Sequence, residues 1–282
     1  MKLVRFGEKG AEKPGAIDSQ GRIRDLSGVV ADFTPDVLTI ETRDRLTALD
    51  LETLPVVGGN PRLGAPIART GHFIAIGLNY VDHAKEAGQP IPAEPVIFSK
   101  APSSLSGPDD DVILPRGSEK GDWEIELGFV MGRHCHYVAQ SDALSAVFGY
   151  VLANDVSERA FQIEGTGQWI KGKSAPTFGP IGPWLVTPDE IPDPQDLDMS
   201  LDVNGERRQT GNTRTMIFPV AELIAYLSEK MDLEPGDLVI TGTPPGVGLG
   251  MRPQQFLKPG DEMHLTMAKL GEQRQKVVAF RG

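Results

Sequence analysis

The chain of 282 residues has one cysteine, no long apolar run and no cluster of basic residues. The single cysteine, Cys135, excludes an intrachain disulfide and is typical of a reducing compartment, so we expect a cytoplasmic protein. No stretch is apolar over the roughly 20 residues that a membrane span needs, and the first residues lack the apolar segment of a secretory signal. A net charge of −11 without a basic cluster argues against nucleic acid as a partner.

Cys135 lies between His134 and His136, which raises the question of a zinc site. Three consecutive residues cannot all face one ion from a strand, because neighbouring side chains point to opposite faces. No second cluster of cysteine or histidine lies nearby in the sequence. We therefore predict no metal site at this position.

The length allows one large domain and a small one. Short strand candidates at Lys2–Phe6, Pro14–Asp18 and Arg22–Leu26 are separated by glycine-containing turns. Thr47–Leu54 is predicted to be a short helix that stops before a proline, and Gly58–Pro61 resembles a linker. We predict a small N-terminal β-rich domain of residues 1–70, with a structural role, and a main domain of residues 71–282.

The most informative stretch runs from Asp122 to Val130 and alternates apolar with acidic residues. In an extended strand, residues two apart share a face, so Glu124 and Glu126 would lie together with Cα atoms roughly 6.5–7 Å apart. That spacing allows two carboxylates to share a cation. The alternative is a strand with a solvated acidic face, which is the commoner arrangement for a Glu-x-Glu pair.

Two further segments carry candidate chemistry. A short helix predicted at Tyr80–Ala87 would place His83 and Glu86, three residues apart, on one face. A carboxylate beside an imidazole raises its basicity and fixes its orientation, which suits a general base; an exposed surface pair is the alternative. Asp155 ends an apolar strand candidate, where it could be a third metal ligand or cap the following turn.

Other segments complete the outline. Pro95–Lys100 is a strand candidate that ends in a lysine, Ser141–Phe148 is predicted to be a short helix, and Pro219–Met231 is the clearest amphipathic helix. Gly165–Pro183 is predicted to be a long loop and contains Lys173, where a solvated lysine would be the ordinary outcome. The glycine-rich run Thr241–Gly248 matches neither a P-loop nor a dinucleotide fingerprint, yet its backbone amides and Thr243 could face the carboxylate of a ligand.

Together these pieces resemble the fumarylacetoacetate hydrolase family, from about residue 72 to residue 280. The first 70 residues are similar to the small N-terminal unit that many members carry. Each matching segment is weak alone, but five of them occur in the family's order. They are Gly77–Glu86, Trp123–Gly128, Asn154–Ser157, Gly172–Ser174 and Thr241–Pro244.

The resemblance implies an α+β fold, a mixed β-sheet roll with a small N-terminal β-rich domain, assembled as a homodimer or dimer-based oligomer. It implies a Mg²⁺ or Mn²⁺ ion, which fits oxygen ligands, and a histidine–glutamate dyad that activates water on a helix ordering over substrate. Lys173 would support developing negative charge. The implied metal ligands are Glu124, Glu126 and Asp155; the implied catalytic residues are His83, Glu86 and Lys173; the implied substrate-binding residues are Tyr80, Lys100, Arg159, Gln162 and Thr243.

Two departures from the family pattern remove acids near the site. Arg159-Ala160-Phe161-Gln162 lacks the aspartate often found at its second position, and Lys173-Ser174 is followed by Ala175-Pro176 instead of Phe-Asp. Within the family, Asp109–Asp111, Leu114–Ser118 and Phe178–Trp184 most resemble members that act on 2,4-diketo-3-deoxy sugar acids.

The resemblance therefore implies metal-dependent hydrolysis of a carbon–carbon bond in a β-diketo acid, giving pyruvate and a small hydroxy acid such as lactate. The same site could serve an acylpyruvate hydrolase, an oxaloacetate decarboxylase, a lyase or a tautomerase. A metal-stabilised binding protein is the alternative outside enzymes, and a dyad on a mobile element speaks against it because binding alone needs no base.

Overall fold

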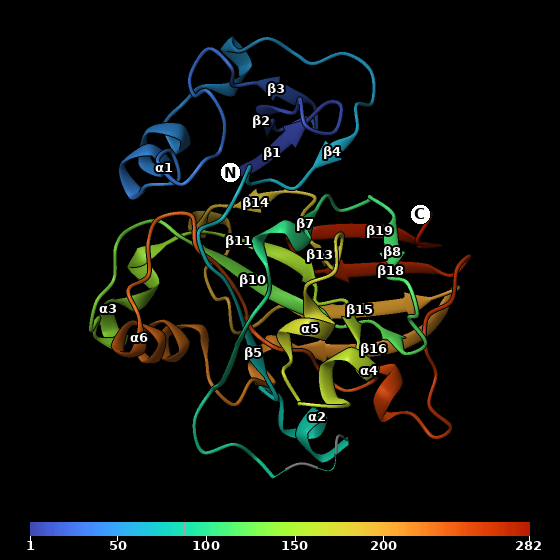
Figure 1. The fold of residues 1–282 in the computed structure, drawn as a ribbon. Helices are drawn as coiled ribbons and strands as arrows, with labels where there is room; N and C mark the ends of the chain where they lie inside the picture. The colour runs from blue at the N-terminus through green and yellow to red at the C-terminus, as the bar shows by residue number, and fades with distance from the viewer. Residues whose placement is uncertain (87, 89) are drawn as a thin grey trace.

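The computed structural model describes residues 1–86, 88 and 90–282, and describes residues 83–85 by their backbone alone. Within these residues, a sheet of ten strands and a sheet of five form a rolled, mixed β structure with a few short helices at its edges (Figure 1). The predicted α+β class and mixed β roll are confirmed.

The larger sheet runs in the order β3, β2, β1, β14, β11, β10, β17, β5, β6, with β4 paired to β1. Neighbouring strands are antiparallel except β17 and β5, which are parallel. The strands are β1 (Lys2–Phe6), β2 (Lys13–Ile17), β3 (Ile23–Asp25), β4 (Leu63–Gly64), β5 (Phe73–Gly77), β6 (Val96–Ser99), β10 (Ile125–Met131), β11 (Val147–Asn154), β14 (Leu185–Val186) and β17 (Leu238–Ile240).

The five-stranded sheet has the order β16, β15, β18, β19, β8, and two further pairs join β12 to β9 and β13 to β7. These strands are β7 (Leu105–Ser106), β8 (Val112–Leu114), β9 (Gly121–Asp122), β12 (Ser157–Glu158), β13 (Gly179–Pro180), β15 (Asp198–Val203), β16 (Glu206–Asn212), β18 (Glu262–Met267) and β19 (Gly271–Ala279). The α-helices are α1 (Ile40–Thr47), α2 (Val81–Glu86), α3 (Gln140–Ala143), α4 (Arg159–Ile163), α5 (Ile170–Lys173) and α6 (Val220–Lys230).

Strand β10 is buried along its whole length because both faces of the large sheet are covered. Ile125, Leu127 and Phe129 point into the core shared with the five-stranded sheet. Val130, of the opposite parity, belongs to the second core, which is packed under the N-terminal segment. The alternation seen in the sequence is therefore real, with apolar contacts on both sides of the strand.

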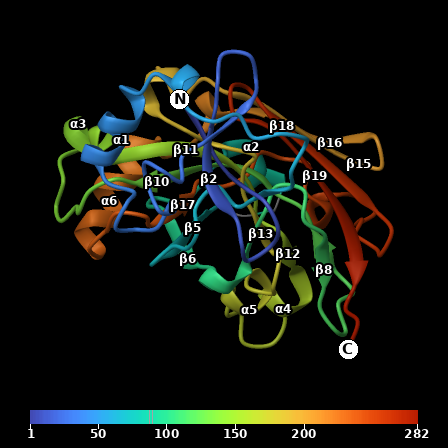
Figure 2. The ribbon, with the colours of Figure 1, turned by 90° about the horizontal axis from the view of Figure 1, so that it is seen from above.

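The N-terminal segment continues the large sheet, since β1 pairs with β14 through Lys2 and Val186. Leu3 and Ala16 of this segment share the second core with Phe148 and other residues of the main sheet. Figures 1 and 2 show this segment lying over one end of the roll. Within the described residues, no helix has the length and apolarity to cross a membrane.

Two helix predictions are wrong in position. The helix predicted at Thr47–Leu54 lies earlier, at α1, because the Thr39 side chain accepts a hydrogen bond from the Thr42 amide and begins it there. Only a 3₁₀ turn, Leu51–Thr53, follows. The helix predicted at Ser141–Phe148 ends by Ala146, since Val147 pairs with Met131 in the sheet.

The prediction of one continuous strand from Asp122 to Val130 is wrong at one point. In the structure this stretch is divided into β9 and β10, with an interruption at Trp123 and Glu124. There the Glu124 amide donates to Asn154 Oδ1 at 3.2 Å and the Ile125 amide to Gln209 Oε1 at 3.0 Å. Side-chain amides thus satisfy backbone groups that a regular ladder would have paired, and the two glutamates leave the chain from different local geometries.

Candidate metal and substrate site

Glu124, Glu126 and Asp155 converge although the third lies far from the first two in sequence. Their side-chain oxygens come within 4.8 Å of one another, and the three residues are between 0 and 5 % exposed. Strand pairing brings them together: Ile125 lies opposite Asn154, and the Asp155 amide donates to the Glu124 carbonyl at 2.9 Å. The solvated acidic face considered from the sequence is excluded.

Asp155 is not a helix cap. Its Oδ1 accepts from Lys100 Nζ at 2.5 Å and its Oδ2 accepts from Lys173 Nζ at 2.5 Å. The helix that follows, α4, is capped by Glu158 instead, whose side chain accepts from the Ala160 amide. The carboxylate of Asp155 is therefore committed to the polar cluster at the end of β11.

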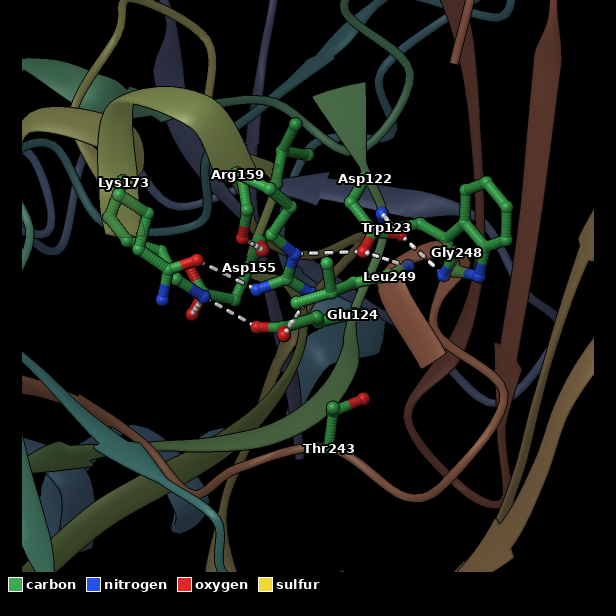
Figure 3. A network of polar contacts seen from close by, with 12 residues as sticks. Asp122, Trp123, Glu124, Asp155, Arg159, Lys173, Thr243, Gly248 and Leu249 are labelled. Carbon is green, nitrogen blue, oxygen red and sulfur yellow. Dashed lines mark hydrogen bonds and ion pairs between the residues drawn. The ribbon is translucent and has the colours of Figure 1, made fainter. Parts of the chain in front are cut away.

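Two more contacts bind the cluster together (Figure 3). Lys173 Nζ also donates to Glu124 Oε2 at 2.5 Å, and Arg159 Nη2 donates to Glu124 Oε1 at 2.6 Å. Lys173 is 2 % exposed, so it is a buried member of the cluster, and the predicted long loop around it forms the short helix α5. Glu126 Oε2 accepts from the Gly242 amide at 2.7 Å, so this part of the glycine-rich run binds a carboxylate of the protein itself. Its contact with a ligand carboxylate stays a prediction.

Crowding of charges in a buried place shifts the proton affinities. Burial, with Asp155 and Glu124 beside it, raises the pKa of Glu126 well above its usual value. Burial lowers the pKa of Lys100, and the nearby Asp155 offsets this only in part. For Lys173, burial acts in the same direction, but Asp155 and Glu124 prevail and raise its pKa, so this ammonium stays charged.

A cavity of about 480 Å³ opens onto the cluster. Glu124, Glu126, Lys173 and Arg159 form its polar end. Its remaining walls come from five segments of the chain and include both apolar and polar side chains: Ile76, Gly77, Leu78, Glu86, Phe98, Gln162, Ile163, Trp169, Thr243, Val247, Leu249, Gly250, Arg252 and Gln254. The cavity is therefore large enough for a small molecule, with a polar, charged end at the cluster and a mixed wall along the remainder.

Glu86 reaches this cavity from α2. The Gly246 amide lies 3.0 Å from Glu86 Oε1 and 3.1 Å from Oε2, so the carboxylate is held against the glycine-rich run. His83 precedes it by one helical turn on α2, but the His83 side chain lies outside the described part of the structure. The structure therefore places Glu86 at the cavity, and the dyad and the role of His83 stay predictions.

The predicted substrate-binding residues divide into two groups. Arg159, Gln162 and Thr243 line the cavity, and Arg159 Nη1 donates to Gln162 Oε1 at 2.9 Å. Tyr80 and Lys100 are not among the lining residues. Lys100 lies behind Asp155, while Tyr80 is in the core, 1 % exposed, with a hydroxyl that has no hydrogen-bond partner among the described residues.

One residue that sequence reasoning passed over is Asp122. It is fully buried and accepts from Arg159 Nε at 2.8 Å, so it stands directly behind a cavity residue. The signal was present in the sequence, because Asp122 has the same parity as Glu124 and Glu126 and precedes a tryptophan. A third acid in an otherwise apolar alternating stretch needs a buried partner.

The donor set fits a hard divalent ion. Three carboxylates from two adjacent chain segments present oxygens alone, with no sulfur or imidazole, which is the preference of Mg²⁺ and Mn²⁺ and not of zinc. The fold and site together define a β-rich enzyme-like protein with a buried carboxylate centre at the bottom of a small-molecule cavity.

The chain belongs to the fumarylacetoacetate hydrolase family. The model of the fumarylacetoacetate (FAA) hydrolase C-terminal family matches residues 72–278. A 2,4-didehydro-3-deoxy-L-rhamnonate hydrolase from Sphingomonas sp. (strain SKA58) is 58 % identical over 282 residues, which is 100 % of this chain and 97 % of that protein.

Solved structures agree with this family. The fumarylacetoacetate hydrolase from Exiguobacterium antarcticum superposes with a TM-score of 0.89 at 35 % identity, covering 99 % of this chain and 100 % of that one. The maleylpyruvate hydrolase from Sphingobium sp. SYK-6, solved with manganese(II) and pyruvate, has a TM-score of 0.82 at 29 % identity and covers 100 % of both chains.

Proposed function

We propose that this protein is a metal-dependent hydrolase that cleaves the carbon–carbon bond of a 2,4-diketo-3-deoxy sugar acid into pyruvate and a hydroxy acid such as lactate. The observation that carries the proposal is the buried cluster of Glu124, Glu126 and Asp155 at the bottom of a cavity that Glu86 also lines. The rhamnonate hydrolase relative and the neighbour solved with manganese(II) and pyruvate support the substrate class and the product.

Charge balance favours an acidic substrate. Counted as ionised, Asp122 and the three clustered carboxylates exceed the three cations Lys100, Arg159 and Lys173 by one negative charge. A divalent ion would reverse that excess and leave the cavity attractive to a carboxylate. We propose that Glu124, Glu126 and Asp155 hold Mg²⁺ or Mn²⁺.

When bound, such an ion supplies Lewis-acid polarisation of the substrate's carboxylate and 2-keto oxygens. Arg159, Gln162 and Thr243 orient the substrate. In the proposed mechanism His83, with Glu86 as the partner that orients it, takes a proton from a water, and the resulting hydroxide adds to the C4 carbonyl. The C3–C4 bond then breaks, its electron pair passes to the pyruvate fragment as an enolate, and C4 leaves as the carboxylic acid of the hydroxy acid, which loses its proton to solvent.

Lys173 would stabilise the negative charge that develops on the pyruvate fragment, because its ammonium is buried in the cluster. Burial alone would lower the pKa of Lys173, but the neighbouring Asp155 and Glu124 carboxylates raise it, so the side chain stays charged. Protonation of C3 by the acid formed at His83 completes the reaction. Water thus supplies the hydroxyl of one product and, through the base, the proton of the other.

The test is a substrate panel measured with and without EDTA, with Mg²⁺ or Mn²⁺ added back. The panel contains 2,4-diketo-3-deoxy-L-rhamnonate, an acylpyruvate, maleylpyruvate and oxaloacetate, and products are identified by chromatography. Equimolar pyruvate and lactate from the first, lost with EDTA, support the proposal. Release of CO₂ from oxaloacetate instead indicates a decarboxylase, and a melting shift with Mg²⁺ without turnover indicates a binding protein.

We also propose that the protein acts in the cytoplasm as a homodimer or dimer-based oligomer. The single, buried cysteine suits a reducing compartment, and the family resemblance supports the assembly. Light scattering coupled to size exclusion measures the assembly directly; a monomer at assay concentration would contradict it.

A further inference from the structure

Asp122 has four hydrogen bonds and no spare capacity. Its Oδ1 accepts from the Trp123 amide at 2.9 Å and the Gly248 amide at 2.7 Å, and its Oδ2 from the Leu249 amide at 3.0 Å and Arg159 Nε at 2.8 Å (Figure 3). A carboxylate offers about four lone-pair positions. Asp122 is therefore not placed to bind an ion or a substrate itself, although it lies beside residues that are.

On one side, Asp122 fixes the guanidinium of Arg159. Each nitrogen of that group has a different partner: Nε donates to Asp122, Nη1 to Gln162 and Nη2 to Glu124. The guanidinium is a planar, rigid fork, so holding Nε determines where the other two nitrogens point. The direction of Arg159 into the cavity thus depends on Asp122.

On the other side, Asp122 holds the backbone of the 246–249 loop. Gly248 lies so close to its surroundings that an added Cβ would be 1.9 Å from the Gln255 carbonyl oxygen. Trp123 Nε1 donates to the Gly246 carbonyl at 3.1 Å, which fixes the beginning of the same loop. The loop is therefore a rigid piece of backbone with little freedom to adjust.

The same loop also contacts α2, because the Gly246 amide donates to the Glu86 carboxylate. Contacts thus run without a gap from Glu86 through the loop to Asp122, and from Asp122 through Arg159 to Glu124. One buried carboxylate stands midway between the helix that carries the proposed base and the residues at the polar end of the cavity.

We propose that Asp122 is a positioning residue that couples the docking of Glu86 to the orientation of Arg159. The proposal rests on the proposed function only for its kinetic readout; its structural readout is independent of any substrate. If the coupling holds, loosening either end of the chain of contacts loosens the other.

The first test uses hydrogen exchange of the intact, metal-loaded protein. Asp122→Asn places an amide NH₂ where two donors now point, and Glu86→Ala removes the contact at Gly246. We expect each variant to speed exchange at Gly246, Gly248 and Leu249 together. Exchange that rises only at the amide next to the mutated side chain overturns the coupling, and so does unchanged exchange in folded Asp122→Asn.

The second test is a double-mutant cycle of Asp122→Asn and Glu86→Ala on kcat and KM. Loss of a charge-assisted hydrogen bond predicts a rise in KM on the order of 10- to 100-fold for Asp122→Asn, and the double variant should be little worse than the poorer single one. Additive losses would indicate that Asp122 only stabilises the fold.

Asp237→Asn is the matched control. Asp237 is also a buried aspartate that accepts from two backbone amides, those of His72 and Glu234, and it does not line the cavity. We expect Asp237→Asn to lower the melting temperature but leave KM unchanged and combine additively with Glu86→Ala. If no substrate is turned over by the unmodified protein, the proposed function fails while the exchange test still decides the coupling.

Discussion

Lys100 Nζ lies 2.5 Å from Asp155 Oδ1, and neither side chain has any exposure to solvent. The cation therefore supports a candidate metal ligand from behind, and does not face the cavity where substrate would bind. Its second contact, with the Val156 carbonyl at 3.3 Å, ties the ammonium to the same turn. We now propose a supporting role for Lys100 in place of direct substrate contact.

Replacing Lys100 by methionine should destabilise the protein strongly, because a buried carboxylate loses one of its two cations. Breaking a buried pair typically costs on the order of 3 kcal/mol or more. Lys120→Met is the control, since Lys120 makes an exposed pair with Glu164 that should matter little. Urea unfolding measures both; equal midpoints for the two variants would contradict the prediction.

Replacing Glu124 by glutamine should abolish metal-dependent turnover and weaken Mg²⁺ or Mn²⁺ binding measured by calorimetry. Loss of a direct ligand should exceed the 10- to 100-fold that outer partners of a metal site typically contribute. Glu164→Gln serves as the matched exposed control. A Glu124→Gln protein with normal metal affinity would remove this residue from the proposed ligand set.

Replacing His83 by alanine should leave metal binding intact and lower kcat by about 10²- to 10⁴-fold, the usual contribution of a positioned general base. Glu86→Gln should lose a smaller factor, because a glutamine oxygen can still accept from the Gly246 amide but carries no charge to support an imidazolium. Single-turnover kinetics on the proposed substrate measure both, and unaltered turnover in His83→Ala would refute the base assignment.

The raised pKa of Glu126, caused by burial and by the neighbouring carboxylates, gives a pH dependence for the protein in EDTA. A folded-state pKa above the unfolded value means that the folded chain binds this proton more tightly. Its stabilising contribution is full below the ordinary carboxyl pKa and is lost as pH rises through the raised value. Stability in EDTA should therefore fall as pH rises above about 5.

Glu126→Gln checks this pH dependence, because a glutamine resembles the protonated acid at every pH. Urea midpoints of this variant should show a smaller decline with rising pH than those of the unmodified protein. Metal binding requires the ionised carboxylate, so calorimetry in buffers of different ionisation enthalpy should reveal proton release on Mg²⁺ binding. Parallel pH curves for the two proteins would contradict the assignment of the slope to Glu126.

Replacing Gly246 by alanine should impair turnover more than stability alone explains. Gly246 has φ +109°, and an added Cβ would lie 2.0 Å from the Arg208 carbonyl oxygen, so the loop that receives Glu86 must move. Gly260 has φ +101° with open space around it. Gly260→Ala should thus show the backbone strain, about 1–2 kcal/mol, with normal kcat, and equal kcat losses in both variants would count against the loop.

Sequence reasoning reached the three clustered acids because strand alternation and strand ends can be recognised from neighbouring residues, and because the matching segments occur in the family's order along the chain. It failed at the interruption between β9 and β10, where Asn154 and Gln209 supply hydrogen bonds from residues distant in sequence. It gave no sign that Lys100 turns toward Asp155, since a strand-ending lysine does not reveal which way its side chain points. The parity of Asp122 with Glu124 and Glu126 was visible in the sequence, but its partners, which come from α4 and the 248–249 backbone, were not.

The helix predicted at Thr47–Leu54 failed because competing caps are hard to rank from sequence. Thr39 begins α1 and Asp50 begins the later 3₁₀ turn, and both are good cap residues. Tertiary contacts decided between them: Leu46 of α1 is fully buried in the second core. Packing against a separate part of the chain therefore decided which of the two cap residues begins the longer helix.

The pairing of β1 with β14 has a practical consequence for engineering. Deleting the first 70 residues would remove β1 from one side of β14 and leave an unpaired strand edge there, together with an exposed apolar face where Leu3 and Ala16 now pack. Such a truncated protein should aggregate during expression, even though every residue that lines the cavity remains in its sequence. Relatives that dispense with this segment would need another cover, from a different insertion or from a second subunit.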